Sequence, residues 1–562
     1  MTAKGKIVFT LLFLAVIGFG VWKWWDKLVP KHPVMTQSGA GTAAGDSAAP
    51  ASATSTTASA KEVVETKTET PKLPGGLAYQ PKDNTVIVEL SEYAGYAGII
   101  AANGGLAPNT NSVFFKKHGF LVHLTMSEEE SWPELNAGKM AASATTADVL
   151  AIYGKQFQVI VPAQIGFSRG ADGVVVRSEI KRINDLKGKI LATSQFTEAD
   201  FFIRYLAQEA GLGINMLPDL KTSPDPEKLN LIYCTDAFAA GDLFLRDVKE
   251  GGNLLAGCVT WDPKTTEVAD GSGGRAHVLA TTKNLLVVAD ILIVNKGFAQ
   301  AHPDMVAGLV EGLLEGNRMV NDNPASQYDV IGKAFKWDRQ KTQSELAKVH
   351  LSNLPENLAF FSGAIDAAGS FGGIYQSAVY AYGSDLIKDP ADSDHFADLQ
   401  FLKAIDQSGE FKGQQITIAP IRSSATAPVE TDPLLSKDIH FLFAPNSANL
   451  DMNDQDNSKS LEAIKRLLQV SPGSTVLLRG HVDNSMVEEF RKRGGEAFVR
   501  QMALKAVDFS KQRANEIKRL LVEKYNADPK RLEAIGRGWE EPVSATDNDQ
   551  NRRVEAQWFT LE

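Results

Sequence analysis

The most apolar stretch of the chain, Ile7–Trp22, lies close to its N-terminus. As an α-helix, the residues from Ile7 to Trp25 would span about 28 Å, close to the thickness of the hydrocarbon core of a bilayer. Lys4 and Lys6 precede this run, and lysines before a membrane helix favour a cytoplasmic N-terminus. We therefore expect residues 1–27 to form a single-pass inner-membrane anchor, with the bulk of the chain in the periplasm. A cleaved signal peptide is the alternative, although no small-residue cleavage site follows the run.

Hydrophobic periodicity is absent from the stretch that follows. Ser38–Ala60 consists almost entirely of Ser, Gly, Ala, Thr and Pro. Such a composition buries too little apolar surface to offset the entropy that is lost when the chain becomes ordered. We expect residues 28–83 to form a disordered linker rich in Ala, Ser, Thr, Pro and Gly.

Between residues 84 and 384, short β-rich runs alternate with amphipathic helical patterns such as Glu198–Ala210 and Pro303–Val320. This alternation is typical of an α/β domain with parallel strands. The predicted strands are Thr85–Leu90, Leu121–Leu124, Gln158–Val161, Gly173–Val176, Lys189–Thr193, Leu229–Tyr233, Gly257–Trp261 and Ile291–Val294.

A connecting segment, residues 385–433, precedes a smaller domain at residues 434–562. The segment contains a helical piece at Phe396–Ile405 and a loose stretch at Ser423–Pro433. In the smaller domain, the spacing of apolar residues predicts the order β-α-β-α-β-β. Its clearest strands are Ile439–Phe443, Val476–Leu478 and Val554–Phe559, and its two helices bury the faces Leu461, Ile464, Leu467, Leu468 and Ala514, Ile517, Leu520, Leu521.

Charge and cysteine content exclude some classes of protein. A net charge of −10 and a pI near 5.6 argue against a nucleic-acid binder, because neutralising phosphates requires a basic surface. The two cysteines, Cys234 and Cys258, lie in apolar, strand-like runs, which favours two buried thiols over one disulfide. No Cys/His cluster indicates a metal site, and we expect no cofactor.

The segment from 84 to 384 resembles the SsuA-like (nitrate/taurine/sulfonate) substrate-binding proteins of ABC transporters. The motifs that carry this resemblance are Phe114–Phe120, Leu135–Lys139, Ala147–Asp148, Gly170–Val176, Ile183–Lys189, Cys258–Pro263 and Ala301–Asp304. The resemblance implies a two-lobed type II periplasmic-binding-protein fold with a small-molecule ligand between the lobes. We place the two crossings between the lobes at Gly170–Gly173 and Val287–Ile291, where hinge motion would close the cleft.

Polar and aromatic residues at predicted strand ends are the candidates for the cleft. Ser194 and Thr197 lie where a strand leads into a helix, and helix N-termini attract anions. Thr197 is equally suited to cap that helix together with Asp200. The full set of cleft candidates is Tyr93, Tyr96, Thr145, Ser194, Thr197, Trp261 and Asp262.

Two departures from the family pattern concern the ligand. The family commonly has a Trp before the Gly-Tyr pair that follows the first strand, whereas this chain has Tyr93-Ala94-Gly95-Tyr96. It also commonly has Trp-Glu-Pro where this chain has Trp261-Asp262-Pro263. Glu92 and Asp262 would repel an anion if they are ionised, so an amine-bearing or neutral ligand stays open.

The last domain resembles the OmpA-like peptidoglycan-binding family. Five motifs appear in the family's order: Phe443–Leu450, Gly480–Asp483, Ser510–Ala514, Gly536–Pro542 and Asn551–Val554. The resemblance implies recognition of diaminopimelate in the wall peptide, with Asp483 accepting from its ammonium and Arg513 gripping a carboxylate. A structural salt bridge between Asp483 and Arg513 is the alternative. We expect Arg552 and Arg553 to play supporting roles.

The C-terminal domain also departs from its family. Asp483 and Arg513 lie about twice as far apart as usual, so Glu488–Val507 contains an insertion. The Asn that the family places shortly before the helical Arg would fall at Ala506 and is missing. We therefore expect the affinity of this domain for peptidoglycan to be modified.

These features together indicate a membrane-anchored, ligand-binding protein attached to peptidoglycan, with a possible membrane-protein partner. The alternative is a structural, stator-like protein of the MotB type, in which the central domain mediates protein contacts. MotB-type proteins usually carry an Asp in the membrane, and Ile7–Trp22 has none. No GxSxG, HExxH or P-loop motif points to an enzyme.

Overall fold

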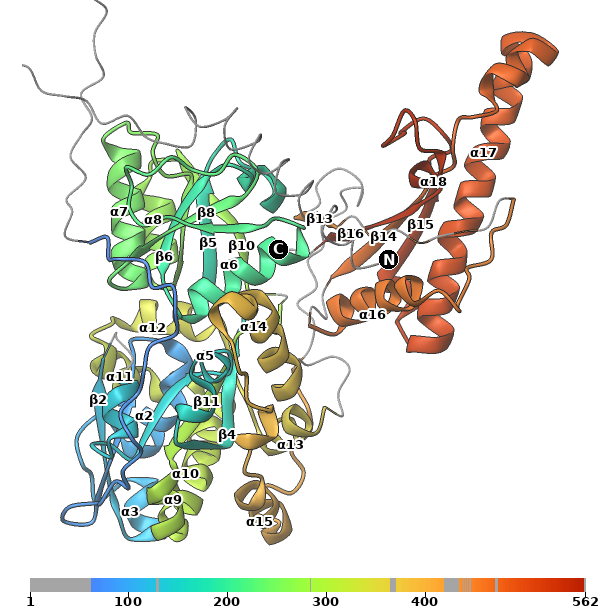
Figure 1. Cartoon of the computed structure of the whole chain (residues 1–562). Coiled ribbons are helices and arrows are strands. Elements are labelled where there is room, and N and C mark those ends of the chain that lie inside the picture. The colour runs from blue at the N-terminus through green and yellow to red at the C-terminus, as the bar shows by residue number, and fades with distance from the viewer. Residues whose placement is uncertain are drawn as a thin grey trace, which may run out of the picture. The chain divides into compact units, whose positions relative to one another are not determined.

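The computed structural model describes residues 62–127, 131–283, 285–363, 370–418, 434–437, 439, 441, 443, 446–470 and 474–559. The expected membrane anchor (residues 1–27) and the first part of the expected linker lie outside these residues. Within them, no helix is both long and apolar enough to cross a bilayer. Figure 1 shows two lobes built from the central part of the chain and a C-terminal domain with one long helix.

The first lobe is built on six strands in the order β12-β4-β11-β3-β1-β2. β1 pairs in parallel with β2 and β3, whereas β11 is antiparallel to β3 and β4. Helices α2 (Ala97–Asn103) and α10 (Pro303–Asp322) cover one face, and α5 (Val149–Tyr153) and α14 (Phe371–Leu386) the other. The strands are β1 (Thr85–Leu90), β2 (Leu121–Met126), β3 (Ala142–Thr146), β4 (Val159–Ser168), β11 (Ala289–Asn295) and β12 (Val349–Leu351).

The second lobe also has six strands, in the order β10-β5-β9-β6-β8-β7. Helices α7 (Ala237–Lys249) and α8 (Lys264–Gly271) cover one face, and α6 (Glu198–Glu209) covers the other (Figure 1). The strands are β5 (Asp172–Arg177), β6 (Ile190–Ser194), β7 (Ile214–Met216), β8 (Leu229–Cys234), β9 (Gly257–Trp261) and β10 (Ala276–Thr281).

The chain crosses between the lobes twice, over residues 169–171 and 282–288. The first crossing overlaps the predicted Gly170–Gly173, and the second begins earlier than the predicted Val287–Ile291. The two-lobed prediction is confirmed, and the predicted parallel strands are present in both sheets together with antiparallel ones. β5 and β11 begin at the edge of their sheets that faces the cleft. The parallel strands end at that same edge, so β5 is antiparallel to β9 and β11 is antiparallel to β3.

Residues 62–82 lie against both lobes, although their composition assigns them to the disordered linker. Val63 forms an antiparallel bridge with Cys234 of the second lobe. The Leu73 amide donates to the Gln156 side chain of the first lobe at 2.9 Å. The linker prediction is therefore wrong for this stretch, because its backbone finds partners on the two lobes that composition does not reveal.

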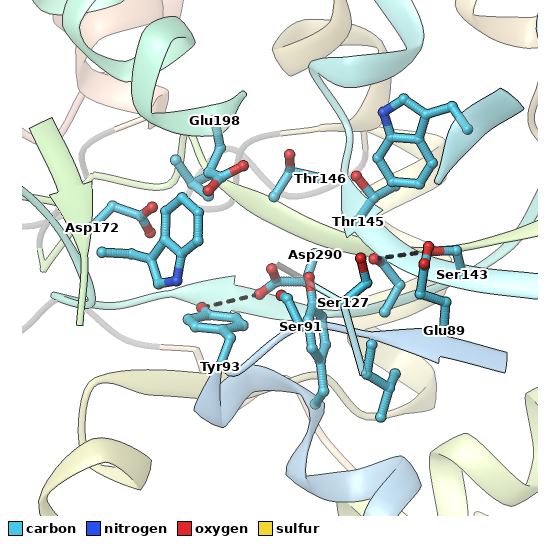
Figure 2. A pocket seen from close by; sticks show the side chains of 16 residues that line it. Glu89, Ser91, Tyr93, Ser127, Ser143, Thr145, Thr146, Asp172, Glu198 and Asp290 are labelled. Atoms are coloured by element: carbon cyan, nitrogen blue, oxygen red, sulfur yellow. Dashed lines mark hydrogen bonds between the residues drawn. The ribbon is translucent and has the colours of Figure 1, made fainter. Parts of the chain in front are cut away.

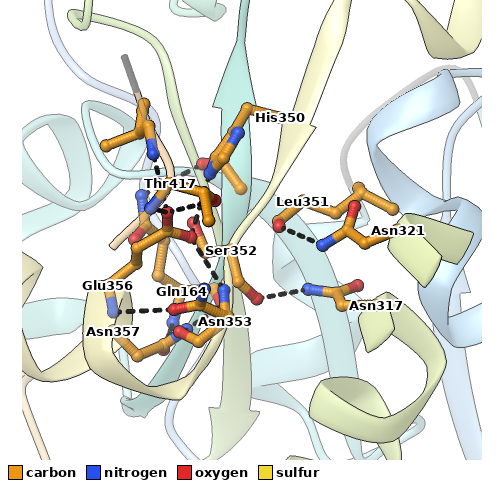
Figure 3. Close-up of polar contacts among 12 residues, drawn as sticks. Gln164, Asn317, Asn321, His350, Leu351, Ser352, Asn353, Glu356, Asn357 and Thr417 are labelled. Atoms are coloured by element: carbon orange, nitrogen blue, oxygen red, sulfur yellow. Dashed lines mark hydrogen bonds and ion pairs between the residues drawn. The ribbon is translucent and has the colours of Figure 1, made fainter. Parts of the chain in front are cut away.

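The buried carboxylate of Glu356, on α13 (Leu354–Ser362), binds the backbone at Thr417 and Ile418, where the described part of the central segment ends. Glu356 Oε1 accepts hydrogen bonds from the amides of Thr417 and Ile418 at 2.7 and 2.9 Å, and Oε2 lies 2.9 Å from His350 Nε2 (Figure 3). Burial acts to raise the pKa of Glu356, but the bonds from His350 and the backbone amides lower it to about 2. The chain is thus fixed at residue 418, ahead of the predicted loose stretch Ser423–Pro433, which lies outside the described residues.

The C-terminal domain has four described strands in the order β13-β16-β14-β15, packed on helices α16 (Gln455–Val470) and α17 (Val487–Tyr525). The two predicted helix faces are buried in its core. The strands are β13 (Leu435–Lys437), β14 (Thr475–Gly480), β15 (Leu532–Gly536) and β16 (Val554–Phe559).

The predicted order β-α-β-α-β-β is present, but the first described strand is β13 rather than Ile439–Phe443. Within the described part of that stretch, Phe443 forms only an isolated bridge with Leu450. The insertion at Glu488–Val507 is helical and extends α17 at its N-terminal end. Gly494 and Gly495 interrupt it, and Gly495 has a φ of 63°.

Candidate functional sites

A small cavity of about 50 Å³ lies between the two lobes (Figure 2). Three kinds of polar or aromatic side chain line it. The carboxylates are Glu89, Asp172, Glu198 and Asp290; the hydroxyls are Ser91, Ser127, Ser143, Thr145 and Thr146; the aromatic residues are Tyr93, Tyr96, Trp132 and Trp261.

Four of the seven residues predicted for the cleft, Tyr93, Tyr96, Thr145 and Trp261, line this cavity. The other three predicted residues do not. The Thr197 hydroxyl donates to the Ser194 carbonyl at 2.9 Å and does not cap α6. Asp262 is 4% exposed and pairs with Lys348 instead. The expected anion site at the start of α6 is therefore not part of the cavity.

Two aspartates that were missed by sequence reasoning, Asp172 and Asp290, stand at the start of the strands that follow the two crossings. They are 2% and 1% exposed. The Tyr93 hydroxyl donates to Asp290 Oδ2 at 3.2 Å (Figure 2). The available signal was a lone Asp inside the apolar run Leu285–Val294, since a buried strand rarely carries a carboxylate without a specific reason.

The cavity is strongly acidic in its lining. Burial, together with neighbouring carboxylates, raises the pKa of Asp172 to about 7 and that of Asp290 well above its ordinary range. Burial also raises the pKa of Asp148, just behind β3, to about 7. Among the described residues, no Lys, Arg or His lines this cavity. An anion in this space would therefore meet no compensating positive charge.

Aromatic rings form the rest of the wall. Tyr93 and Tyr96 pack edge to face with their centroids 5.2 Å apart, and Trp261 packs against Phe238 at 5.2 Å. Trp261 is 7% exposed, and its indole Nε1 has no hydrogen-bond partner within the part of the chain that the structure describes. A buried donor of this kind is costly unless a ligand or water accepts from it.

A second pocket, of about 600 Å³, lies in the C-terminal domain. Asp483, which follows β14, and Arg513, on α17, both line it, so the two residues predicted to bind opposite ends of a zwitterion share one pocket. Arg513 is 1% exposed, and its Nε donates to the Ser447 carbonyl at 3.1 Å. Its Nη1 has no partner among the described residues. Burial lowers the pKa of Arg513 to about 10, so its guanidinium remains charged at neutral pH.

The two supporting arginines differ in their placement. Arg552 lines the pocket, and its Nη1 donates to Asp483 Oδ2 at 3.1 Å. Burial acts to raise the pKa of Asp483, but bonds from Ser485 and Arg552 leave it below its ordinary value. Arg553 is 3% exposed and bonds to Glu555 and the Glu541 carbonyl, away from the pocket lining. Among the described residues, Asp483 therefore pairs with Arg552, not with Arg513.

The insertion contributes to this pocket. Ala506, where the family's Asn is missing, lies in its wall beside Lys505. Phe490 and Met502 come from the inserted part of α17, and the Phe490 ring lies 6.1 Å from that of Trp539. The insertion thus adds apolar surface next to the charged groups.

The described residues contain neither a cluster suited to a metal ion nor a disulfide bond. No group of three or more His, Cys, Asp or Glu side chains there is arranged to hold a metal ion. Cys234 and Cys258 are free and buried, so the interpretation as two buried thiols is confirmed. Burial raises the pKa of the Cys234 thiol to about 12.

Two family models match the chain. The model described as NMT1/THI5 like matches residues 109–327, and that of the OmpA family matches residues 442–555. Both resemblances deduced from the sequence motifs are confirmed. The chain combines an NMT1/THI5-like binding domain with a C-terminal OmpA domain.

Similar proteins include outer membrane protein Omp38 from two strains of Acinetobacter baumannii, at 25% and 24% identity over 146 residues. This match covers 26% of the present chain and only 36% of the length of these relatives. Among solved structures, the alkanesulfonate-binding protein SsuA from Xanthomonas axonopodis pv. citri, bound to MOPS, is 12% identical with a TM-score of 0.43, covering 57% of this chain and 100% of that one. The aliphatic sulphonate binding protein SsuA from Escherichia coli is 13% identical with a TM-score of 0.42, covering 62% and 100%.

Proposed function

We propose that the protein is a non-enzymatic protein of the cell envelope that binds a small ligand between its two lobes and attaches to peptidoglycan through its C-terminal domain. The observation that supports ligand binding is the cavity between the lobes, which both lobes line with polar and aromatic side chains. Such cavities between lobes are the usual binding sites of small molecules.

The second half rests on the pocket that Asp483 and Arg513 share. Diaminopimelate in the wall peptide carries an ammonium and a carboxylate on one carbon. Asp483 accepts hydrogen bonds from the ammonium, and the free Nη1 of Arg513 donates to the carboxylate. Hydrogen bonds from Ser485 and Arg552 hold the pKa of Asp483 below its ordinary value, and Arg553 supports the sheet next to it.

The proposal includes a location. Ile7–Trp22 has the length and composition of a membrane helix, and the Lys residues before it favour a cytoplasmic N-terminus. A single inner-membrane span would leave both binding sites in the periplasm, where the wall is accessible. Protease protection of spheroplasts carrying the full-length protein tests this orientation.

The wall contact is tested with full-length protein in detergent and purified sacculi. Asp483→Ala and Arg513→Ala are expected to reduce the fraction that pellets with sacculi by about tenfold each, since each removes a charged hydrogen-bond partner. Asp508→Ala and Lys511→Ala make the same charge changes at exposed positions of α17 outside the pocket, and are expected to pellet like the wild type. Wild-type pelleting by both pocket variants would refute the assignment.

The cleft is tested by isothermal titration of the same protein with a panel of small polar metabolites. Saturable binding of any one of them, abolished by Tyr93→Ala, supports the ligand-binding role. A cleft that binds no compound favours the alternative in which the central domain only docks other proteins.

A further inference from the structure

The charge of the side chains that line the cavity limits the chemical class of ligand that the cleft between the lobes can bind. Four carboxylates line the cavity, and no basic side chain lines it among the described residues. Asp172 and Asp290 are almost fully buried. In addition to burial, the charge of Asp172 raises the pKa of Asp290, and the charges of Asp148 and Asp262 raise that of Asp172. Two buried carboxylates in one cavity, whose ionised forms are disfavoured by burial and by neighbouring negative charge, are stabilised by a positive group placed between them.

A second, independent observation concerns Trp261. Its indole N–H can only donate, it is buried in the wall of the cavity, and no described residue accepts from it. The neighbouring carboxylates favour a cation, and an acceptor atom on the same ligand would satisfy the indole N–H. The Tyr93 hydroxyl of the same cavity donates to Asp290, and within the described part of the chain it does not accept from Trp261 Nε1.

We propose that the cleft binds a small aliphatic amine that also carries an oxygen acceptor, with its ammonium between Asp172 and Asp290 and its oxygen at Trp261 Nε1. This inference rests on the proposed ligand-binding function and adds the chemical class. The rings of Tyr93 and Tyr96 provide the aromatic surface on which an ammonium is further stabilised.

Size limits the ligand further. A cavity of about 50 Å³ has room for a molecule that replaces a few water molecules. A two-carbon amino alcohol fits this limit, whereas an amine with a bulky substituent requires the lobes to open.

Three two-carbon compounds that differ in one group each provide the test, by isothermal titration into the full-length protein at pH 8. Ethanolamine carries both groups, ethylammonium lacks the oxygen, and 2-hydroxyethanesulfonate replaces the ammonium with an anion. We expect saturable binding of ethanolamine, about tenfold weaker binding of ethylammonium, and no heat from the sulfonate.

Variants assign the two contacts separately. Asp172→Asn and Asp290→Asn are each expected to weaken ethanolamine binding at least tenfold. Trp261→Phe keeps the aromatic surface but removes the N–H, so it should reduce ethanolamine affinity to that of ethylammonium and leave ethylammonium unchanged. This pattern distinguishes a contact to the ligand from a general loss of packing.

The outcomes separate this inference from the proposed function. Binding of the sulfonate with no response to ethanolamine overturns the inference and leaves the ligand-binding role intact. If neither these three compounds nor any member of the wider metabolite panel binds, both the inference and the ligand-binding role are overturned. Equal affinities for ethanolamine and ethylammonium overturn the role of Trp261.

Discussion

Lys348 Nζ lies 2.8 Å from Asp262 Oδ2, and this ion pair joins the first lobe to the second. The same two residues hold the first crossing of the chain. The Arg169 amide donates to the Lys348 carbonyl, and the Asp262 amide donates to the Ala171 carbonyl, both at 2.8 Å. Because Asp262 directly follows Trp261 of the cavity, the pair connects the cleft wall to the hinge.

Breaking this pair should destabilise the central domain. Lys348→Met leaves the carboxylate of Asp262, which is 4% exposed, without its cation, and we expect a loss of about 2–3 kcal/mol in the free energy of unfolding. Urea unfolding measures this loss, and adding Asp262→Asn should restore much of it.

Lys341→Met is the matched control for Lys348→Met. Its Nζ lies 3.9 Å from Glu267 Oε1, and both side chains are partly exposed, so the change should cost less than about 0.5 kcal/mol. Equal costs for the two variants would contradict the assignment of the Lys348 pair to the hinge.

Asp172 should make the ligand-free protein less stable as the pH rises. Its pKa is about 7 in the folded state against an ordinary 3.8, so the folded state binds the proton more tightly than the unfolded state. Stability should therefore fall between about pH 4 and pH 7. Asp172→Asn should flatten this slope and raise the melting temperature at pH 7.5 by a few degrees.

Thermal unfolding from pH 5 to pH 8 checks this, with Asp270→Asn as an exposed carboxylate control. Asp148 and Asp290 titrate in the same cavity region, so part of the slope should remain in the variant. A variant less stable than the wild type at pH 7.5 would show that the ionised Asp172 stabilises the fold.

Glu356 should have the opposite pH dependence. Its pKa is lowered to about 2, so its contribution is complete above about pH 4.5 and is lost as the pH falls towards 2. Glu356→Gln should cost about 2 kcal/mol at pH 7, because an amide cannot replace the charged acceptor of five hydrogen bonds. Urea unfolding at pH 7 and at pH 3 should show the difference shrinking at the lower pH, and a constant difference would contradict the charge argument. Asp406→Asn is the control on the nearby surface.

The inserted part of α17 should affect wall binding through Phe490. This side chain lines the Asp483 pocket and packs near Trp539, so Phe490→Ala removes about 1 kcal/mol of apolar contact and should weaken sacculus binding about fivefold. Leu504→Ala, on the same helix but 70% exposed and outside the pocket, should have no effect. Sedimentation with sacculi measures both, and a loss with Leu504→Ala alone would place the contact elsewhere on the helix.

The two thiols should be unreactive in the folded protein. Cys258 is 0% and Cys234 2% exposed, and burial holds both thiol pKa values far above neutrality. A thiol reagent such as DTNB should therefore label neither residue until denaturant is added, and reductant should not change the melting temperature. Fast labelling of the native protein would contradict the buried placement.

Local sequence determined several strands and helix faces closely. Thr85–Leu90, Gly257–Trp261 and Val554–Phe559 are strands with the predicted bounds, since runs of β-branched and aromatic residues between polar ends carry a strong local signal. The short motifs around Asp483 and Arg513 likewise led to one shared pocket. β3 is absent from the predicted strands, because Ala142–Thr146 has small and polar side chains that do not alternate.

Only the tertiary structure decided which distant groups meet. Residues 62–82 became ordered because the two lobes offer hydrogen-bond partners and apolar contacts, a long-range effect that composition does not encode. Asp172 and Asp290 are far apart in the sequence, and the two chain crossings bring both to one cavity. The sequence alone determined the two families and the local elements, whereas the acidic character of the cleft arose from how the lobes fold together.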